Sequence, residues 1–226
     1  MLTHETAVLS AAELVRCRAV LAAAPWEDGK VTAGPQSALA KRNLQLPEGS
    51  AAATELGQLV LDALRRHDGF LAAALPLRVF PPLFNRYDVG MGFEAHIDNA
   101  IRFAPSGARY RTDVACTLFL SDPADYDGGE LIIEGAFGEQ RVKLPAGDAV
   151  VYPASSVHRV EPVTRGSRLA AFSWVQSMVR DDGQRALLHG LDRDIAVTRA
   201  ELGDAHPAIV GLTGAYHNLI RMWAET

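Results

Sequence analysis

The sequence predicts a mainly β protein with α-helices: a double-stranded β-helix (jelly roll) core with N-terminal helices before it and a C-terminal helical extension after it. About eight short apolar segments follow residue 75, and turn residues separate them at spacings of roughly 8–12 residues. Helical periodicity precedes and follows this region. We therefore expect three regions in the 226 residues: a helical and strand support region at 1–74, the jelly-roll core at 75–178 and the helical extension at 179–226.

Two helices are expected before the core. Ser10 and Glu13 have the spacing of a capping box, and the helix that they begin should run to about residue 24, before a proline. The second helix should run from residue 51 to about residue 67, because apolar side chains recur there at helical spacing. An Asp-Gly pair at 68–69 is expected to end it.

Polar and apolar side chains alternate over residues 37–46, which predicts a strand. Lys41, Asn43 and Gln45 would share one face of this strand. Polar strand faces are most often solvated, and this is the outcome we expect. The alternative is that these three side chains line a pocket on the substrate side.

The apolar segments of the core predict eight strands. They lie at residues 77–80, 83–87, 115–120, 131–134, 140–144, 149–152, 158–163 and 168–175. Proline, glycine and aspartate mark the turns between them, and Asp127-Gly128-Gly129 is assigned to turn geometry, not to catalysis.

Two further helices are expected after the core, at 182–202 and 207–225. Each carries apolar residues on one face, so the two should pack on each other or on the barrel. We expect them to shield one face of the sheet. A dimer surface is the alternative, and a homo-oligomer is compatible with it.

Composition and charge exclude several classes of function. The net charge is −5 at pH 7 with both signs spread along the chain, so no basic stripe indicates nucleic acid. No apolar run is long enough to span a membrane, and the N-terminus has no signal-peptide pattern. Cys17 and Cys116 are expected to be buried free thiols, as in a reducing cytosol. A soluble, cytoplasmic protein is therefore predicted.

His96, Asp98 and His158 are the candidate metal ligands. His96 and Asp98 are two residues apart, so an extended strand would point both side chains to one face. His158, from a distant strand, could complete the set. Two histidines and one carboxylate that leave other coordination positions open are the ligands of non-haem Fe(II) oxygenases.

Arg168 is the candidate partner of an anionic co-substrate. It begins an apolar strand, ten residues after His158, and a guanidinium that points inward there would need an anion. Its fork of N–H donors suits a carboxylate. A dicarboxylate that chelates iron at one end and meets Arg168 at the other is 2-oxoglutarate. Tyr87, on an earlier strand, could offer a hydroxyl to the same pocket, or it could be a packing aromatic.

At these positions the chain resembles the Fe(II)/2-oxoglutarate dioxygenases of the prolyl 4-hydroxylase type, and more narrowly the bacterial PKHD-type hydroxylases associated with iron uptake. The resemblance covers nearly the whole chain and is carried by the segments 41–45, 85–87, 92–98, 127–131, 153–158, 166–168 and 216–219. It implies that His96, Asp98 and His158 bind iron, that Arg168 binds the carboxylate of 2-oxoglutarate, and that Tyr87 lies near the co-substrate.

The activity that the resemblance implies is hydroxylation of a small-molecule or peptide substrate. Fe(II) is the cofactor, 2-oxoglutarate and O₂ are co-substrates, and ascorbate is a further candidate cofactor. Val114, Cys116, Leu118 and Phe172 are suggested as apolar walls of the pocket. Two other functions stay open: a metal-binding jelly roll of cupin-like chemistry, which would leave Arg168 without a purpose, and a non-catalytic iron sensor.

Overall fold

The computed structural model describes residues 1–32 and 40–226, and its centre is an antiparallel sheet of eight strands. Seven strands follow one another in the order β1 (Thr3–Glu5), β14 (Ala149–Pro153), β10 (Val114–Phe119), β17 (Arg168–Ser177), β6 (Leu83–Tyr87), β4 (Leu44–Gln45) and β2 (Glu27–Asp28). The eighth, β5 (Pro76–Val79), also pairs with β17.

A second antiparallel sheet faces the first. Its order is β13 (Gly138–Val142), β12 (Leu131–Gly135), β15 (His158–Val160), β7 (Gly92–His96) and β3 (Lys41–Arg42). Two ribbons complete the strands: β11 (Tyr126–Gly128) with β16 (Val163–Gly166), and β8 (Ile101–Phe103) with β9 (Arg109–Arg111). Two packed antiparallel sheets with added helices confirm the predicted jelly-roll class.

Both faces of the large sheet are buried, because alternate residues of its strands enter two different cores. On β10, Val114, Cys116 and Leu118 join the core beneath the helices, whereas Ala115 and Phe119 join the core between the sheets. Every residue of β10 is buried. The large sheet is therefore the middle of three layers.

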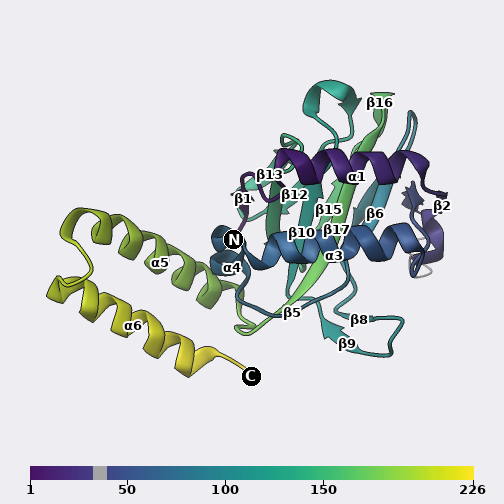
Figure 1. The fold of residues 1–226 in the computed structure, drawn as a ribbon. Coiled ribbons are helices and arrows are strands. Elements are labelled where there is room, and N and C mark those ends of the chain that lie inside the picture. Colours follow the sequence, from purple (N-terminus) through teal and green to yellow (C-terminus); the bar gives the residue numbers. More distant parts are fainter. Residues whose placement is uncertain (33–39) are drawn as a thin grey trace.

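Helices α1 (Ala11–Ala23) and α3 (Ala51–Arg65) cross the outer face of this sheet (Figure 1). The capping box of α1 is present: Ser10 Oγ accepts from the Glu13 N–H, and the Glu13 carboxylate accepts from the Ser10 N–H.

The Asp-Gly pair at 68–69 does not end the helical region as predicted. It begins α4 (Asp68–Ala74), whose N-cap His67 accepts from the Phe70 N–H. Two short 3₁₀ turns also occur, η1 (Gly29–Thr32) and η2 (Pro123–Asp125).

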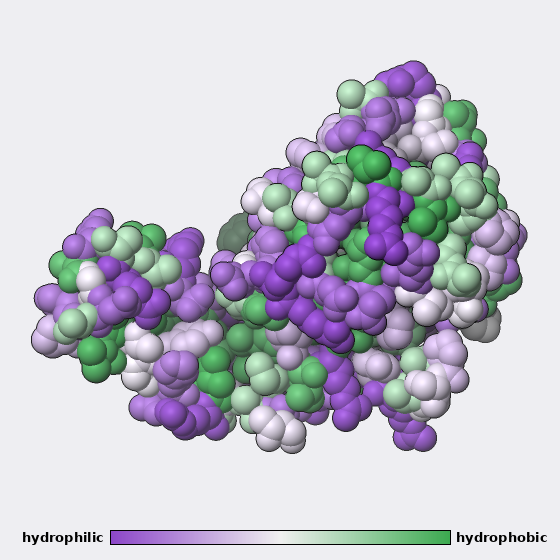
Figure 2. Space-filling view, viewed as in Figure 1, coloured by the Kyte–Doolittle hydropathy of each residue, from purple (hydrophilic) through white to green (hydrophobic). Residues whose placement is uncertain are grey.

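The C-terminal helices form where they were predicted, as α5 (Asp182–Leu202) and α6 (Pro207–Trp223), and they pack on each other. The expectation that they shield the sheet is wrong. Figure 1 shows the pair projecting from the end of the molecule, where α5 meets α4, and Figure 2 shows the same projection in a space-filling view. The physical reason is that α1 and α3 already cover one face of the large sheet and the second sheet covers the other.

Two predicted strands are each divided between elements. Residues 158–163 form β15 and β16, which are separated at Glu161 and Pro162, and proline cannot donate to a strand ladder. Within 37–46, residues 37–39 lie outside the described residues, and β3 and β4 belong to different sheets with Asn43 between them. That segment therefore crosses from one sheet to the other. The short strands β1, β2, β8, β9 and β11 were not predicted.

Within the two described stretches, no helix combines the length and the apolar character that crossing a bilayer requires.

Gly128, at the end of β11, gives a prediction about stability. Gly128 has φ +70°, and a Cβ there would overlap with the Pro162 carbonyl oxygen on the ribbon that leads to β17. We expect Gly128→Ala to lower the free energy of unfolding by about 3 kcal/mol or more, since backbone strain and a steric clash add. Gly90→Ala is the matched control, because Gly90 has φ +82° with open space around it, and it should cost about 1 kcal/mol. Urea unfolding measures the free energy of unfolding of both variants. Equal losses in the two would contradict the steric clash expected at Gly128.

Candidate active site

His96 and His158 lie directly opposite each other on the neighbouring strands β7 and β15. Residues opposite each other in an antiparallel pair point to the same face of the sheet. Their ring centroids are 4.3 Å apart. The strand register therefore brings together two imidazoles that are far apart in the sequence.

Each imidazole is oriented by a backbone carbonyl two residues before it. Nδ1 of His96 lies 2.8 Å from the Glu94 oxygen, and Nδ1 of His158 lies 3.0 Å from the Ser156 oxygen. A carbonyl only accepts, so we assign the proton of each neutral ring to Nδ1. This tautomer leaves a lone pair on each Nε2, which is the arrangement that metal-binding histidines adopt.

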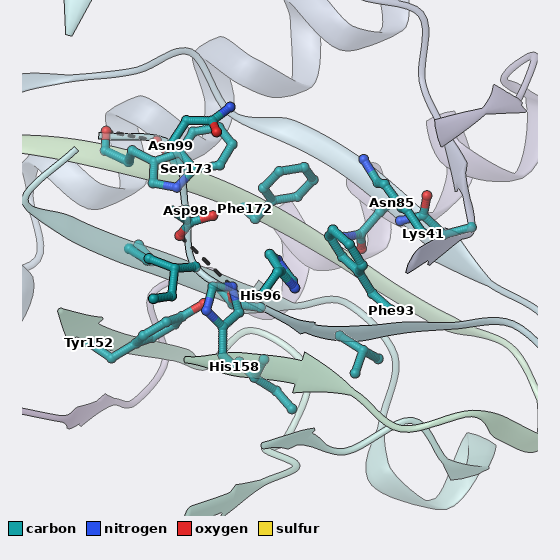
Figure 3. Close-up of a pocket in the computed structure, with 18 of the residues that line it drawn as sticks. Lys41, Asn85, Phe93, His96, Asp98, Asn99, Tyr152, His158, Phe172 and Ser173 are labelled. Atoms are coloured by element: carbon teal, nitrogen blue, oxygen red, sulfur yellow. Dashed lines mark hydrogen bonds and ion pairs between the residues drawn. The ribbon is translucent and has the colours of Figure 1, made fainter. Parts of the chain in front are cut away.

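Asp98 completes the group, although not from the position predicted. Strand β7 ends at His96, so Asp98 lies just beyond it and not on the same strand. Its Oδ2 is 3.9 Å from Nε2 of His158, and Figure 3 shows the two side chains turned toward each other. One ligand atom from each of His96, Asp98 and His158 lies within 4.8 Å of the others. The three residues could thus hold one metal ion.

Burial sets the protonation of this group. It lowers the pKa of His96 to about 4, and the neighbouring His158 adds to the effect. Burial raises the pKa of Asp98, against the opposing influence of His158 and the Trp174 indole. His96 is therefore neutral near pH 7, as a metal ligand must be.

Arg168 and Tyr87 lie opposite each other on β17 and β6. Arg168 is 1% exposed, and its Cζ lies 5.4 Å from the ring centroid of Tyr87 and 5.1 Å from that of Phe119. Among the described residues, its Nε and Nη1 have no hydrogen-bond partner. A guanidinium buried between aromatic rings is thus left with donors available for a ligand.

One cavity joins the two groups. Its volume is about 830 Å³ including its open mouth, and its lining includes the three candidate metal ligands, Arg168 and Tyr87. Of the suggested apolar walls, Cys116 and Phe172 line it. Val114 and Leu118 instead belong to the core beneath the helices. An enclosed lining of apolar side chains with a few converging polar groups is typical of a small-molecule site.

The polar face at Lys41, Asn43 and Gln45 is not solvated, as we had expected, but buried. The three residues are 5%, 3% and 0% exposed. Lys41 donates to Gln45 Oε1, and Lys41 and Asn43 line the cavity. The alternative reading, that this face lines a pocket, therefore holds for these two residues.

Polar side chains that line the cavity and were not predicted include Asn85, Arg102 and Tyr152. Asn85 stands two positions before Tyr87 on β6, so strand periodicity could have placed both on one face. Tyr152 could have been found in the same way from its strand, β14. Arg102 lies on the short β8–β9 ribbon, which no local sequence pattern predicted.

The chain matches two family profiles. One is described as the 2OG-Fe(II) oxygenase superfamily and matches residues 82–176, and the other is the PKHD-type hydroxylase C-terminal domain and matches residues 182–225. PKHD-type hydroxylases of Methylobacterium nodulans and Gluconobacter oxydans are 61% and 59% identical over all 226 residues, which is the full length of each. A solved prolyl-4-hydroxylase from Pseudomonas putida is similar in fold, with a TM-score of 0.53 and 22% identity, over 78% of this chain and 92% of that one.

The burial of Lys41 gives a pH-dependent prediction. Burial, with a further contribution from Arg102, lowers its pKa to about 8 from an ordinary value of 10.5. Between these two pKa values the unfolded chain binds more protons than the folded protein, so the free energy of unfolding rises with pH there. Below pH 8 the burial of the charged amine lowers the free energy of unfolding by its full amount. We expect Lys41→Met to raise the free energy of unfolding at pH 7 by roughly 1–3 kcal/mol, and the gain to shrink toward pH 10.

Urea unfolding of the metal-free proteins at pH 7 and pH 10 measures this difference. Lys30→Met is the matched control, because Lys30 is exposed, and it should show no such gain. A Lys41→Met gain of the same size at both pH values would contradict the prediction.

Proposed function

The chain belongs to the PKHD-type hydroxylases, which are Fe(II)/2-oxoglutarate-dependent dioxygenases, and on this basis we propose that it hydroxylates a C–H bond of a small-molecule or peptide substrate in the cavity between its sheets. When bound, Fe(II), 2-oxoglutarate and O₂ supply the oxidation, and 2-oxoglutarate is decarboxylated to succinate and CO₂. The protein's part is to bind, orient and shield the reactants.

In this proposal His96, Asp98 and His158 hold the iron. The donor set supports it, because two neutral imidazoles and one carboxylate on one side of an ion are the ligands of non-haem Fe(II) oxygenases. The tautomers support it as well, since both Nδ1–H groups donate to backbone carbonyls and both Nε2 atoms keep a lone pair.

Arg168 would bind the carboxylate of 2-oxoglutarate that is remote from the metal, and this residue carries the proposal. A guanidinium that is 1% exposed and has unpartnered Nε and Nη1 donors, as far as the described residues show, is costly without an anion. A carboxylate matches its fork of donors. Tyr87 would donate to the same carboxylate, because burial raises the pKa of its hydroxyl and keeps it protonated.

The walls of the cavity would exclude water from the reacting centre. Phe93 stacks on His96 with 3.6 Å between ring centroids, and Phe172 meets Trp174 edge-on at 5.5 Å. All of these residues line the cavity. Such a wall protects reactive oxygen chemistry from side reactions.

A metal-binding jelly roll of cupin-like chemistry or an iron sensor would use the same three ligands. Neither gives Arg168 a purpose, which favours the dioxygenase. The use of ascorbate and the link to iron uptake stay predictions from the family resemblance, and a homo-oligomer stays an open alternative for the C-terminal helices.

Anaerobic titration with Fe(II) and 2-oxoglutarate tests this function through the weak visible charge-transfer absorbance of the chelate. We expect the absorbance in the wild type and none in His96→Ala. Arg168→Met should raise the half-saturating 2-oxoglutarate concentration about 100-fold, because charge-assisted hydrogen bonds to a carboxylate are lost.

Arg141→Met is the matched control, because Arg141 is exposed on β13, and it should titrate like the wild type. Absence of the absorbance in folded, metal-loaded wild type, or an unchanged titration of Arg168→Met, would refute the co-substrate assignment.

A further inference from the structure

The cavity has a surplus of positive charge. Among its described lining residues, Lys41, Arg102 and Arg168 are cations, and Asp98 is the carboxylate. A divalent metal and a dianionic co-substrate cancel each other, so a site loaded as proposed keeps two net positive charges. Arg168 is assigned to the co-substrate, so the surplus is carried by Lys41 and Arg102. Glu48 acts on both cations from outside the lining and offsets part of this charge.

Arg102 is held next to the candidate metal ligands by aromatic rings. Its Cζ lies 4.6 Å from the centroid of Trp174 and 5.5 Å from that of Phe80. These two rings meet edge-on, 5.6 Å apart. Burial lowers the pKa of Arg102 and the charges of Glu48 and Asp98 oppose this, so Arg102 is within electrostatic reach of Asp98. Stacking of this kind fixes a guanidinium in one plane.

Lys41 approaches the same ligands from another strand. It lies opposite Phe93 in the β3–β7 pair, with Nζ 5.7 Å from the ring centroid. Phe93 in turn stacks on His96. Lys41 is only 5% exposed, and burying its amine lowers the stability of the folded protein. Such a cost is expected at a residue whose role is to bind a ligand.

Asn85 is an independent indication of a polar ligand. It is 8% exposed and lines the cavity, and its Oδ1 has no hydrogen-bond partner within the described residues. Figure 3 shows Asn85 and Lys41 on the side of His96 that is away from Tyr152. A buried amide oxygen without a partner is expected to meet a donor on a ligand.

We propose that Lys41 and Arg102 select a small organic anion as the substrate, by binding its carboxylate or phosphate group. Asn85 then accepts a hydrogen bond from a donor on the same molecule, and the apolar part of the substrate lies against Phe93 and Trp174. This inference rests on the proposed function, because it assigns Arg168 to 2-oxoglutarate.

The test uses the full chain loaded with Zn(II), which is redox-inactive, and saturated with 2-oxoglutarate. Binding of benzoate, phenyl phosphate and the neutral isostere benzamide is measured by calorimetry and ligand-observed NMR. We expect the better of the two anions to bind about tenfold more tightly than benzamide, and the pair of anions separates carboxylate from phosphate recognition. Lys41→Gln and Arg102→Gln should each remove most of this preference, while Lys41→Arg and Arg102→Lys keep part of it.

The matched control is Arg109→Gln, on the partner strand of the same ribbon, because Arg109 is exposed and does not line the cavity. It should bind like the wild type, and all variants should bind 2-oxoglutarate within about twofold of it. Equal binding of benzamide and both anions, no binding of either anion, or an unchanged preference in both Gln variants would overturn the proposal. Failure of the wild type to bind 2-oxoglutarate would instead refute the proposed function, and that is measured first.

Discussion

The register between β7 and β15 is the constraint on which the candidate site depends. It sets His96 opposite His158, and a slip of one residue would turn one imidazole to the other face of the sheet. A second register, between β6 and β17 in the other sheet, sets Tyr87 opposite Arg168. Packing the two sheets on each other brings both pairs into one cavity. The site is therefore made of cross-strand pairs, and each end of it belongs to a different sheet.

The cavity contains the kinds of groups that a core normally excludes. Arg168 and Lys41 are almost fully buried, and Asp98 is held where burial opposes its charge. The protein tolerates them because it has two extensive apolar cores, one between the sheets and one beneath the helices. Conflict between local burial and local charge is expected at functional sites, where binding a ligand offsets the cost.

Local patterns predicted the elements that turn residues delimit, and missed what depends on distant partners. Strand β6 and helix α5 have the predicted bounds, since Pro81-Pro82 precedes one and Asp181 caps the other. The motif residues were found because their chemistry is rare in strands. The burial of the face with Lys41, Asn43 and Gln45 was not predictable. A two-residue alternation shows which side chains share a face of a strand, but it does not show what covers that face. Likewise, nothing local shows that β7 ends at His96 or that the outer face of the sheet is already occupied when α5 begins.

The helical extension meets the rest of the molecule mainly where α5 packs on α4, and this bears on how the protein opens. Its junction includes a cluster around Leu75, Val179 and Leu188, and the buried Arg185, whose Nη1 donates to the carbonyls of Val179 and Arg180. After α6, Glu225 accepts from Arg111 Nη1 at 2.9 Å. Most of α6 stays exposed. Elements with few buried contacts open at lower free energy than the sheets, so we expect α5 and α6 to exchange their amide hydrogens as a cooperative unit of their own. Opening of this unit would leave formed the strand registers that bring the candidate metal ligands together.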